Sequence, residues 1–455
     1  MPVHVIDSIF FKDLFGSSRM RAVFDDSMLL QKWLDFEAAL ARAEATMGLI
    51  PKDAADEITR KAQAQLMDTS KIKDGIDKTI HPLVSMIWQL SEICDGDAGK
   101  YVHWGATTQD VMDTALILQI KDAVVIFEET ISELKIALIH MAKEYRNTPI
   151  AGRTHGQQAL PTTFGYKVAV WLAELHRHTL RLNQAKHRVL VGEFGGAVGT
   201  LAGLNESEID AMAIHSVVME ELDLNVPTIA WHTSRDGIAE FTHILCMVSA
   251  LMGRIAKEII ELQKQEIGEL EEPFEMGKVG SSTMPQKRNP MLCESILTLA
   301  RLCREKSSTA IDTLIYNEHE RDWASFQMEW AFIPEVCVMT QGALEMTLRV
   351  INGLHVHPKR MLRNMNITHG LLLSERVMFA LGEYLGRQDA HDIVYACAME
   401  AVESETRFVD ILMKNSDVNV HLTRDELETL LDPTQYTGLA AQFVDQVIKE
   451  VESEP

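Results

Sequence analysis

The densest group of chemically capable side chains lies in residues 280–290, which read Gly-Ser-Ser-Thr-Met-Pro-Gln-Lys-Arg-Asn-Pro. Hydroxyls, an ammonium, a guanidinium and an amide share one short loop that a glycine opens and two prolines stiffen. A glycine-led loop that enters a helix leaves backbone N–H groups free to bind an anion. A carboxylate is therefore a suitable ligand, and a solvated loop between helices is the simpler alternative. The side chains that can surround the carboxylate are those of Ser281, Ser282, Lys287 and Asn289.

Two earlier stretches also concentrate polar groups. The first, Tyr101–Asp110, contains Thr107 and Thr108 just before a long helical pattern. Their hydroxyls can bind a carboxylate, but the local pattern favours the capping of a helix N-terminus. The second stretch, residues 152–165, places His155 beside glycines that let a ligand approach closely. A single histidine is more often a surface or core residue, so His155 alone does not define a site.

Charged residues mark two further candidates. Arg235, within Trp231–Asp236, can clamp a carboxylate with two hydrogen bonds, and a surface ion pair beside a capping Ser234 is the alternative. Residues 317–322 read NEHERD, and alternating charges of this kind are usually solvated. The glycine cluster at 195–200 lacks a Walker lysine and does not follow a predicted strand. We interpret it as a loop that packs closely, not as a phosphate site.

The sequence carries no metal or nucleophile motif. HExxH and GxSxG are absent, and none of the six cysteines forms a CxxC pair, so we predict no metal site and reduced cytoplasmic thiols. The formal net charge of −23, without a basic stripe, argues against nucleic-acid binding. No stretch approaches 18 uncharged apolar residues, and the N-terminus lacks a basic region followed by an apolar run. We therefore predict neither a signal peptide nor a membrane span.

Long helices must position these groups, because prolines are widely spaced through the middle of the chain. Between Pro227 and Pro273, apolar residues that step alternately by three and four form a heptad seam: Ile238, Phe241, Leu245, Val248, Met252, Ile255, Ile259 and Leu262. Similar patterns run through residues 112–146, 165–190, 291–314 and 326–352. Five such helices predict an all-α, elongated bundle, and nothing in this region predicts a sheet.

Shorter helical patterns flank the bundle. Residues 26–48 place apolar positions at helical spacing between a capping Asp25 and Gly48, and shorter helices follow between residues 52 and 90, with a polar segment at 71–80. Beyond residue 355 the predicted helices are 358–364, 372–386, 389–402, 406–415, 423–431 and 438–451. We divide the chain into an N-terminal helical domain (1–104), a central long-helix domain (105–355) with a loop at 276–290, and a C-terminal helical domain (356–455).

The long seams also predict self-association. One bundle of this kind has more apolar surface than four neighbouring helices can cover. Seams on the outer faces would let bundles of different subunits pack together, so we predict a homo-oligomer.

Taken together, these stretches resemble the fumarase/aspartase superfamily over nearly the whole chain. Residues 280–290 match the signature GSSxMPxKxNP at every defined position. Residues 103–110 and 152–165 match two further signature stretches in the family's order. Within the superfamily, the chain is most similar to the branch of adenylosuccinate lyase and bacterial 3-carboxy-cis,cis-muconate cycloisomerase.

The resemblance implies an all-α, three-domain homotetramer with a twenty-helix core, in which three subunits build each active site. It implies a cofactor-independent β-elimination that usually releases fumarate, or the related cycloisomerisation. The expected partner is a small substrate that contains a dicarboxylate.

The resemblance also implies roles for individual residues. Ser281 matches the base, His155 the general acid, and Glu294 the carboxylate that orients His155. His81 matches a second histidine of adenylosuccinate lyases and is included with the catalytic group. The residues expected to bind the substrate are Thr107, Thr108, Gln109, Thr154, Gln157, Arg235, Ser282, Met284, Lys287, Asn289 and Arg321.

Positions that differ between the two branches bear on the reaction. The bacterial cycloisomerases carry Trp-Leu in place of His155–Gly156 and lack a carboxylate at Glu294, so these residues favour an acid-assisted elimination. Residues 7–24 look more like the cycloisomerase, and Ile80 replaces an arginine of many adenylosuccinate lyases. We therefore predict a cytoplasmic lyase that cleaves a C–N bond of a succinyl-type substrate and releases fumarate. The alternatives are the cycloisomerase and a non-catalytic member such as a lens crystallin, which the intact catalytic residues disfavour.

Overall fold

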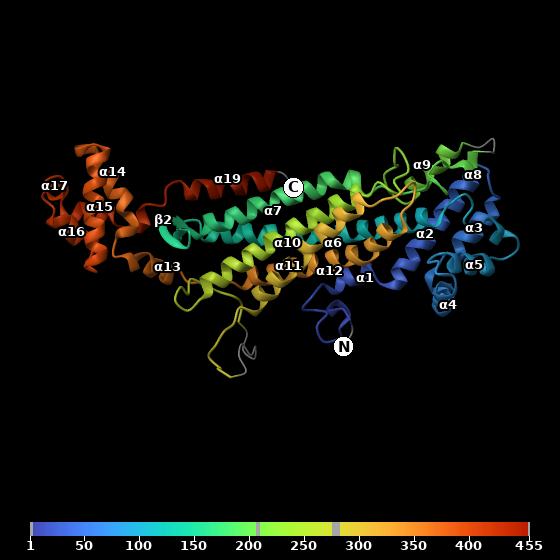
Figure 1. The fold of residues 1–455 in the computed structure, drawn as a ribbon, viewed down its shortest axis with the longest axis horizontal. Helices are drawn as coiled ribbons and strands as arrows, with labels where there is room; N and C mark the ends of the chain where they lie inside the picture. Colours follow the sequence, from blue (N-terminus) through green and yellow to red (C-terminus); the bar gives the residue numbers. More distant parts are fainter. Residues whose placement is uncertain (1–2, 206–209, 275–282, 454–455) are drawn as a thin grey trace. The chain divides into compact units, whose positions relative to one another are not determined.

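A computed structural model describes residues 3–205, 210–274 and 283–453 of the chain. The described residues are predominantly helical, and the prediction of an all-α fold is confirmed (Figure 1). The α-helices are α1 (Ser18–Val23), α2 (Asp26–Thr46), α3 (Lys52–Lys61), α4 (Thr69–Thr79), α5 (Val84–Ile93), α6 (Thr108–Glu144), α7 (Phe164–Val189), α8 (Ala202–Asn205), α9 (Ala211–Glu221), α10 (Asp236–Gln263), α11 (Met291–Ile315), α12 (Trp323–Gly353), α13 (Pro358–Met365), α14 (Ser374–Leu385), α15 (Arg387–Glu403), α16 (Phe408–Lys414), α17 (Ser416–Asn419), α18 (Arg424–Leu430) and α19 (Ala440–Ser453). Short 3-10 helices are η1 (Val5–Asp7), η2 (Ala64–Leu66), η3 (Ala98–Tyr101), η4 (Asn366–Thr368), η5 (Leu371–Leu373) and η6 (Pro433–Gln435). The strands are β1 (Pro149–Thr154), β2 (Gln157–Thr163), β3 (Leu270–Glu271) and β4 (His355–Val356).

The chain divides into two compact units. The first unit comprises Met1–Ser132, Arg177–Gly253 and Ser295–Met346, and the second comprises Glu133–His176, Arg254–Glu294 and Thr347–Pro455. Helices α6, α7, α10, α11 and α12 each contribute residues to both units. These five helices are the ones that the long apolar patterns predict. The division into three domains at 104/105 and 355/356 stays a prediction.

The heptad seam forms one buried face of α10. All eight of its residues, from Ile238 to Leu262, are at most 2% exposed. Helix α10 is also long and apolar enough to cross a membrane, but 72% of its most apolar window is buried inside the protein. Burial of this kind is typical of a core helix, and the alternating spacing of three and four explains it, because such residues share one side of a helix.

Helix α4 lies in the segment whose sequence is mainly polar. Asp68 caps its N-terminus and accepts hydrogen bonds from the backbone N–H groups of Ser70 and Lys71. A Cβ atom on Gly75 would lie 1.9 Å from the hydroxyl oxygen of Ser85 in α5, so only glycine allows the two helices to approach this closely. A glycine in the middle of a helix lowers its intrinsic propensity, which hid this helix from the sequence pattern.

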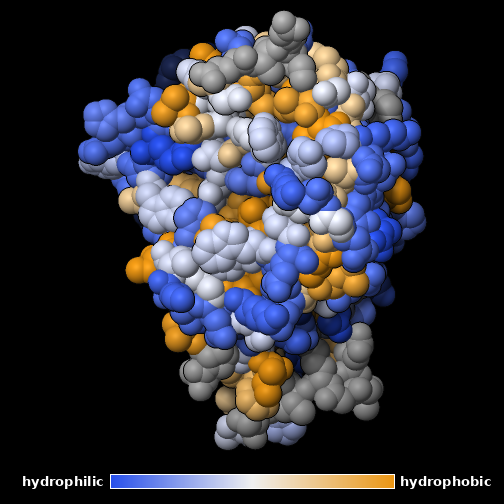
Figure 2. Space-filling view, turned by 90° about the vertical axis from the view of Figure 1, so that its right-hand side faces the viewer, coloured by the Kyte–Doolittle hydropathy of each residue, from blue (hydrophilic) through white to orange (hydrophobic). Residues whose placement is uncertain are grey.

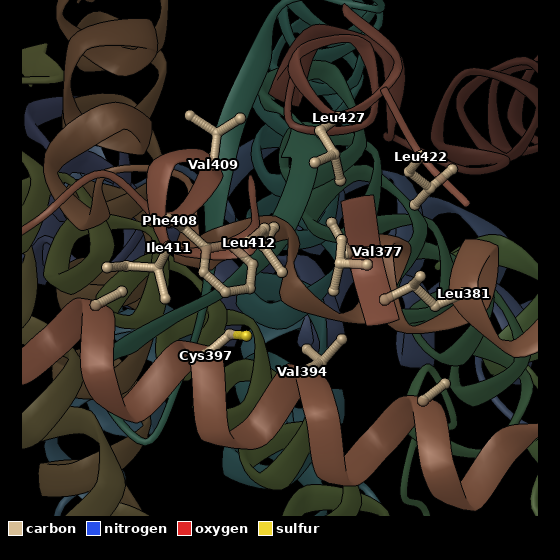
Figure 3. Packing of buried hydrophobic residues seen from close by; sticks show 13 residues of the cluster. Val377, Leu381, Val394, Cys397, Phe408, Val409, Ile411, Leu412, Leu422 and Leu427 are labelled. Carbon is tan, nitrogen blue, oxygen red and sulfur yellow. The ribbon is translucent and has the colours of Figure 1, made fainter. Parts of the chain in front are cut away.

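The C-terminal helices of the second unit enclose a core of their own. All six helices predicted beyond residue 355 are present within about two residues of their expected ends. Figure 3 shows Val394 and Cys397 of α15 directed toward side chains of α14 and α16. The buried members of this cluster include Val377, Leu381, Val394, Cys397, Phe408, Ile411, Leu412, Leu422 and Leu427.

Apolar side chains also remain on the surface of the long helices. Figure 2 shows hydrophilic and hydrophobic residues intermixed on the face that it presents. Large apolar side chains that are more than a third exposed on α6, α7, α10 and α11 are those of Val125, Ile136, Val170, Met247, Met291, Ile311, Leu314 and Ile315. The homo-oligomer stays a prediction, and these side chains are the positions at which it can be probed.

A buried carboxyl group in α2 leads to a prediction about pH and stability. Glu44 is fully buried, and neither oxygen has a hydrogen-bond partner among the residues that the structure describes. Burial, and then the nearby charge of Glu37, raises the pKa of Glu44 to about 9. In the unfolded chain the carboxyl ionises near its ordinary pKa of 4.5, whereas in the folded protein it stays protonated. Folding stability is therefore lost as the pH rises from the unfolded pKa toward the folded one.

We expect Glu44→Gln to remove this loss, because glutamine does not ionise. Relative to the wild type, the variant should gain roughly 2–4 kcal/mol of stability between pH 5 and pH 8. Thermal unfolding at both pH values measures the gain. Glu220→Gln, at an exposed position of α9, serves as the control and should show no such gain. An equal pH dependence in wild type and Glu44→Gln would contradict a protonated Glu44.

Candidate active site

Four predicted site residues from three distant parts of the sequence meet in the first unit. The Nε2 atom of His81 lies 3.2 Å from the hydroxyl oxygen of Thr108, the first residue of α6. The neighbouring hydroxyl of Thr107 accepts a hydrogen bond of 3.0 Å from a guanidinium N–H of Arg321. All four residues are half-buried. Two hydroxyls, an imidazole and a guanidinium are thus brought together at the N-terminus of α6, where the helix dipole also favours an anion.

Arg321 is held by a loop that was not predicted to take part in the site. Its second terminal nitrogen, Nη2, donates to the carbonyl oxygens of Gly196 and Ala197 at 3.5 and 3.0 Å. A Cβ atom on Gly196 would lie 3.1 Å from the carbonyl oxygen of Gly105, so close packing explains the glycine. The Nε atom of Arg321 has no hydrogen-bond partner within the described ranges. The guanidinium therefore retains a buried N–H donor without a described acceptor, which a carboxylate can use only where the surrounding groups move aside.

The hydrogen bonds of His81 define its protonation state. Its Nδ1 atom accepts a hydrogen bond of 3.2 Å from the backbone N–H of Val84, so the proton of the neutral ring resides on Nε2 and points to Thr108. Burial, and then the nearby charge of His103, lowers the pKa of His81. A neutral imidazole with Nδ1 occupied is suited to orient Thr108. In this arrangement His81 has no free lone pair with which to take a proton.

We therefore expect His81→Gln to keep most of the activity, because the side-chain amide can donate to Thr108 in place of Nε2. His81→Ala removes the donor, and we expect kcat/KM to fall about 10-fold, the loss of roughly one hydrogen bond. Steady-state kinetics of the two variants measure the difference. A fall of 100-fold or more in both variants would instead show that His81 transfers a proton.

Two residues predicted to bind the substrate are buried in the first unit. Arg235 is 1% exposed, and its guanidinium donates to both oxygens of Asp113, at 2.8 and 2.7 Å, and to both oxygens of Glu329. This placement argues against the predicted clamp on a substrate carboxylate, because the planar donor set is already filled by protein carboxylates. Gln109 is also 1% exposed and donates to Asp113 and to the carbonyl oxygen of His232. Both side chains stabilise the fold beneath the site.

His155 lies at the tip of a β-hairpin in the second unit. Strands β1 and β2 pair in an antiparallel sheet in which Thr154 faces Gln157. His155 and Gly156 form the two-residue turn, and both have positive φ, at 51° and 78°. This is the geometry of a type I′ turn, and it leaves the side chains of Thr154, His155 and Gln157 exposed. The expectation of no strand in this region is thus wrong, because a His-Gly turn and two strand prolines hid the hairpin from the sequence pattern.

The signature loop lines a cavity in the second unit. The cavity measures about 520 Å³ and is lined by Met284, Lys287 and Asn289, together with Lys264 and Arg288. Lys287 is exposed there. Three cationic side chains, offset in part by the carboxylate of Glu266, make this concave surface suited to an anionic ligand. Ser281 and Ser282 lie outside the described residues.

Glu294 lies in the first turn of α11, just after the signature loop, and its side chain is exposed. Its backbone N–H donates to the carbonyl oxygen of Pro290 at 2.9 Å. Among the described contacts of the second unit, none joins His155 to Glu294 or to residues 283–290. The orienting role of Glu294 stays a prediction.

Left-handed backbone conformations occur within or beside several of the predicted stretches, and also elsewhere in the described residues. Non-glycine residues with positive φ include Ile80 beside His81, His103 at 63°, His155 and His319 at 55°. Ile80, at 55°, is β-branched, and its left-handed conformation is therefore a true outlier. Strained residues of this kind gather at functional sites because the surrounding structure must hold them in place.

One buried cluster has the geometry of a possible metal site. Ligand atoms of Asp110, Glu193 and His232 lie within 4.8 Å of one another. Each oxygen of Asp110, however, already accepts two hydrogen bonds, and Glu193 accepts one from the backbone of Trp231. Hydrogen bonding accounts for the cluster, and the absence of a metal site stays a prediction.

The comparisons with known proteins agree with the resemblance in the sequence. The family model described as "Lyase" matches residues 16–303, and the model described as "Adenylosuccinate lyase C-terminus" matches residues 370–447. The chain belongs to the fumarase/aspartase superfamily of lyases.

Three proteins illustrate the similarity. The chain is 43% identical to an N-acetyl-S-(2-succino)cysteine lyase of Enterococcus italicus, over 98% of this chain and 97% of that protein. It is 40% identical to the adenylosuccinate lyase of Methanocaldococcus jannaschii, over 100% of this chain and 97% of that protein. The crystal structure of 3-carboxy-cis,cis-muconate lactonizing enzyme from Pseudomonas putida superposes with a TM-score of 0.91 at 36% identity, covering 98% of this chain and 99% of that one.

Proposed function

We propose that this protein is a lyase that acts on a succinyl-type substrate by β-elimination and releases fumarate without a cofactor. The observation that carries the proposal is the convergence of Thr107, Thr108, His81 and Arg321 at the start of α6. Hydroxyl and guanidinium donors of this kind suit a substrate carboxylate, and Arg321 retains an unused donor. Relatives named for lyase reactions on succinyl compounds support the same reaction class.

The chemistry explains why so many donors are needed. A proton must leave a carbon next to a carboxylate, which produces a doubly charged aci-carboxylate that only preorganised donors can stabilise. We assign the base to Ser281, the acid that protonates the leaving group to His155, and the stabilising donors to Lys287 and Asn289. A serine hydroxyl is a weak base unless its alkoxide is stabilised, so the loop must close around the substrate.

The leaving group can be attached through nitrogen or through sulfur. The branch residues favour cleavage of a C–N bond, as in adenylosuccinate lyase. The name of the relative from Enterococcus italicus adds cleavage of a C–S bond as a second possibility. Ile80, an exposed apolar residue beside His81, supports a leaving group that carries no phosphate.

The residues assigned to the site occur in both units. We propose that they meet in a homotetramer in which different subunits contribute to each active site, and that the enzyme works in the cytoplasm. The exposed apolar side chains on the long helices support this assembly.

A second candidate reaction is the cycloisomerisation of 3-carboxymuconate. The close match to the solved lactonizing enzyme favours it. His155 and Glu294 favour elimination instead, because the bacterial cycloisomerases lack both.

One experiment separates the two reactions. The purified protein is incubated with a panel of N-succinyl compounds, S-succinyl compounds and 3-carboxymuconate, and fumarate and lactone are followed by absorbance and chromatography. Fumarate from a succinyl compound supports the proposal and identifies the bond that is cleaved. Formation of lactone alone would overturn it.

A further inference from the structure

Asp110 occupies the centre of a hydrogen-bonded network beneath the candidate site. Its side chain is fully buried in the third position of α6. One carboxylate oxygen, Oδ1, accepts from the backbone N–H of Gly195 at 3.0 Å and from Nε2 of His232 at 2.8 Å. The other, Oδ2, accepts from the backbone N–H groups of Thr107 and Gly196, both at 2.9 Å. All four partners donate, so the site requires an acceptor on each oxygen.

The same backbone segments hold Arg321. The guanidinium donates to the hydroxyl of Thr107 on one side and to the carbonyl oxygens of Gly196 and Ala197 on the other. Asp110 therefore fixes the backbone of both segments that supply the acceptors of Arg321. No other described residue hydrogen-bonds to the backbone N–H of both Thr107 and Gly196.

His232 balances the buried charge of Asp110. Burial lowers the pKa of His232, but the hydrogen bond to Asp110 and the nearby carboxylates of Glu193 and Asp113 outweigh burial and raise the pKa above its ordinary value. His232 and Asp110 form a buried pair joined by a hydrogen bond, and removing either partner would leave the other buried without compensation. The two side chains act as one unit.

We propose that Asp110 is a positioning residue that aligns Thr107 and Arg321 with a substrate carboxylate. The inference rests on the proposed function, because it assigns Thr107 and Arg321 to substrate binding. Asp110 itself touches no substrate in this scheme. It acts by holding the start of α6 and the loop at Gly195–Gly196 at a fixed separation.

A double-mutant cycle tests this proposal. Asp110→Asn keeps the shape of the side chain but turns an amide toward N–H donors, which must move apart. We expect kcat/KM to fall about 100-fold, the scale of a misplacement near 1 Å. If Asp110 acts through Arg321, Asp110→Asn in an Arg321→Ala background should lower kcat/KM by less than about 3-fold further. If the fall in kcat/KM of the double variant equals the product of the falls in the two single variants, the proposal is overturned.

Two controls keep the test specific. Asp113→Asn removes another buried carboxylate, one turn further along α6. Its fall in kcat/KM should multiply with the fall caused by Arg321→Ala in the double variant. If Asp110→Asn does not fold, Gly196→Ala displaces the same loop, because its Cβ would lie 3.1 Å from the carbonyl oxygen of Gly105 at a φ of 72°. In an Arg321→Ala background, Gly196→Ala should also lower kcat/KM by less than about 3-fold further. If the falls in kcat/KM of the two single variants multiply in the double variant, the proposal is overturned.

Crystal structures of the wild type and of Asp110→Asn, or of Gly196→Ala if Asp110→Asn does not fold, give a readout that needs no substrate. We expect the hydrogen bond between Thr107 and Arg321 to be lost in the variant. Its retention, with both carbonyl contacts of Arg321, would overturn the positioning role. Failure of the wild type to release fumarate from any succinyl compound would instead count against the proposed function, and the crystallographic comparison would still decide the role of Asp110.

Discussion

Replacing Ser281 with alanine should lower kcat by about 10²–10⁴-fold, the usual contribution of a catalytic base, while the affinity for substrate changes only a few fold. The expectation rests on the match of residues 280–290 to the superfamily signature, since Ser281 lies outside the described residues. The cavity lined by Met284, Lys287 and Asn289 supports it, because these residues belong to the same signature stretch and offer a cation to an anionic substrate. The hydroxyl acts in proton abstraction, so its loss should affect turnover and spare binding.

Thr283 provides the matched control for Ser281. It occupies the undefined position of the signature and carries a hydroxyl in the same loop. We expect Thr283→Ala to keep kcat within a few fold of the wild type. Steady-state kinetics on the substrate identified by the panel, combined with calorimetric titration of that substrate into Ser281→Ala, separate kcat from binding. Full activity of Ser281→Ala would refute the assigned base.

Replacing Arg235 with methionine should destabilise the first unit by roughly 3–5 kcal/mol. Asp113 and Glu329 are both fully buried, and the substitution would leave two carboxylates facing each other without a cation. The guanidinium also stacks 4.8 Å from the ring of Trp231, so packing is lost together with charge. A residue that only bound substrate would have little effect on stability when replaced.

The control for Arg235 removes the whole charged group. In the triple variant Arg235→Met, Asp113→Leu and Glu329→Leu, no buried charge is left unpaired, and we expect much of the stability to return. Thermal and denaturant unfolding measure both variants. If Arg235→Met unfolds at the wild-type temperature and raises KM instead, Arg235 binds the substrate as the sequence motif first indicated.

The sequence predicted the helices well because their signals are local. Apolar residues spaced by three and four give α10 one continuous buried face, and a capping aspartate marks the start of α2. The hairpin at residues 149–163 was missed because its signal depends on a two-residue turn in which His155 replaces the more usual asparagine. Helix α4 was missed because Gly75 is explained only by its contact with α5.

In the candidate site, too, local sequence signals did not determine the contacts of individual residues. The resemblance to the superfamily named His81, Thr107, Thr108 and Arg321, and the structure brings these four together. From the sequence alone, Arg235 and Arg321 were equal candidates for substrate binding, because both are arginines in polar stretches near predicted helix ends. Only the fold separates them, because one is paired with two buried carboxylates and the other retains an unpaired Nε donor.

By itself, then, the sequence determined the helical architecture, the superfamily and the set of residue types available for elimination chemistry. The tertiary structure alone decided which arginine is paired with buried carboxylates, that His155 lies on a hairpin turn, and that Asp110 hydrogen-bonds both the start of α6 and the loop at Gly195–Gly196. The physical reason is the separation along the sequence between the residues that interact. Periodicity and capping act between residues a few positions apart, whereas most partners of Arg235, Arg321 and Asp110 lie between 85 and 214 positions away and are chosen by packing.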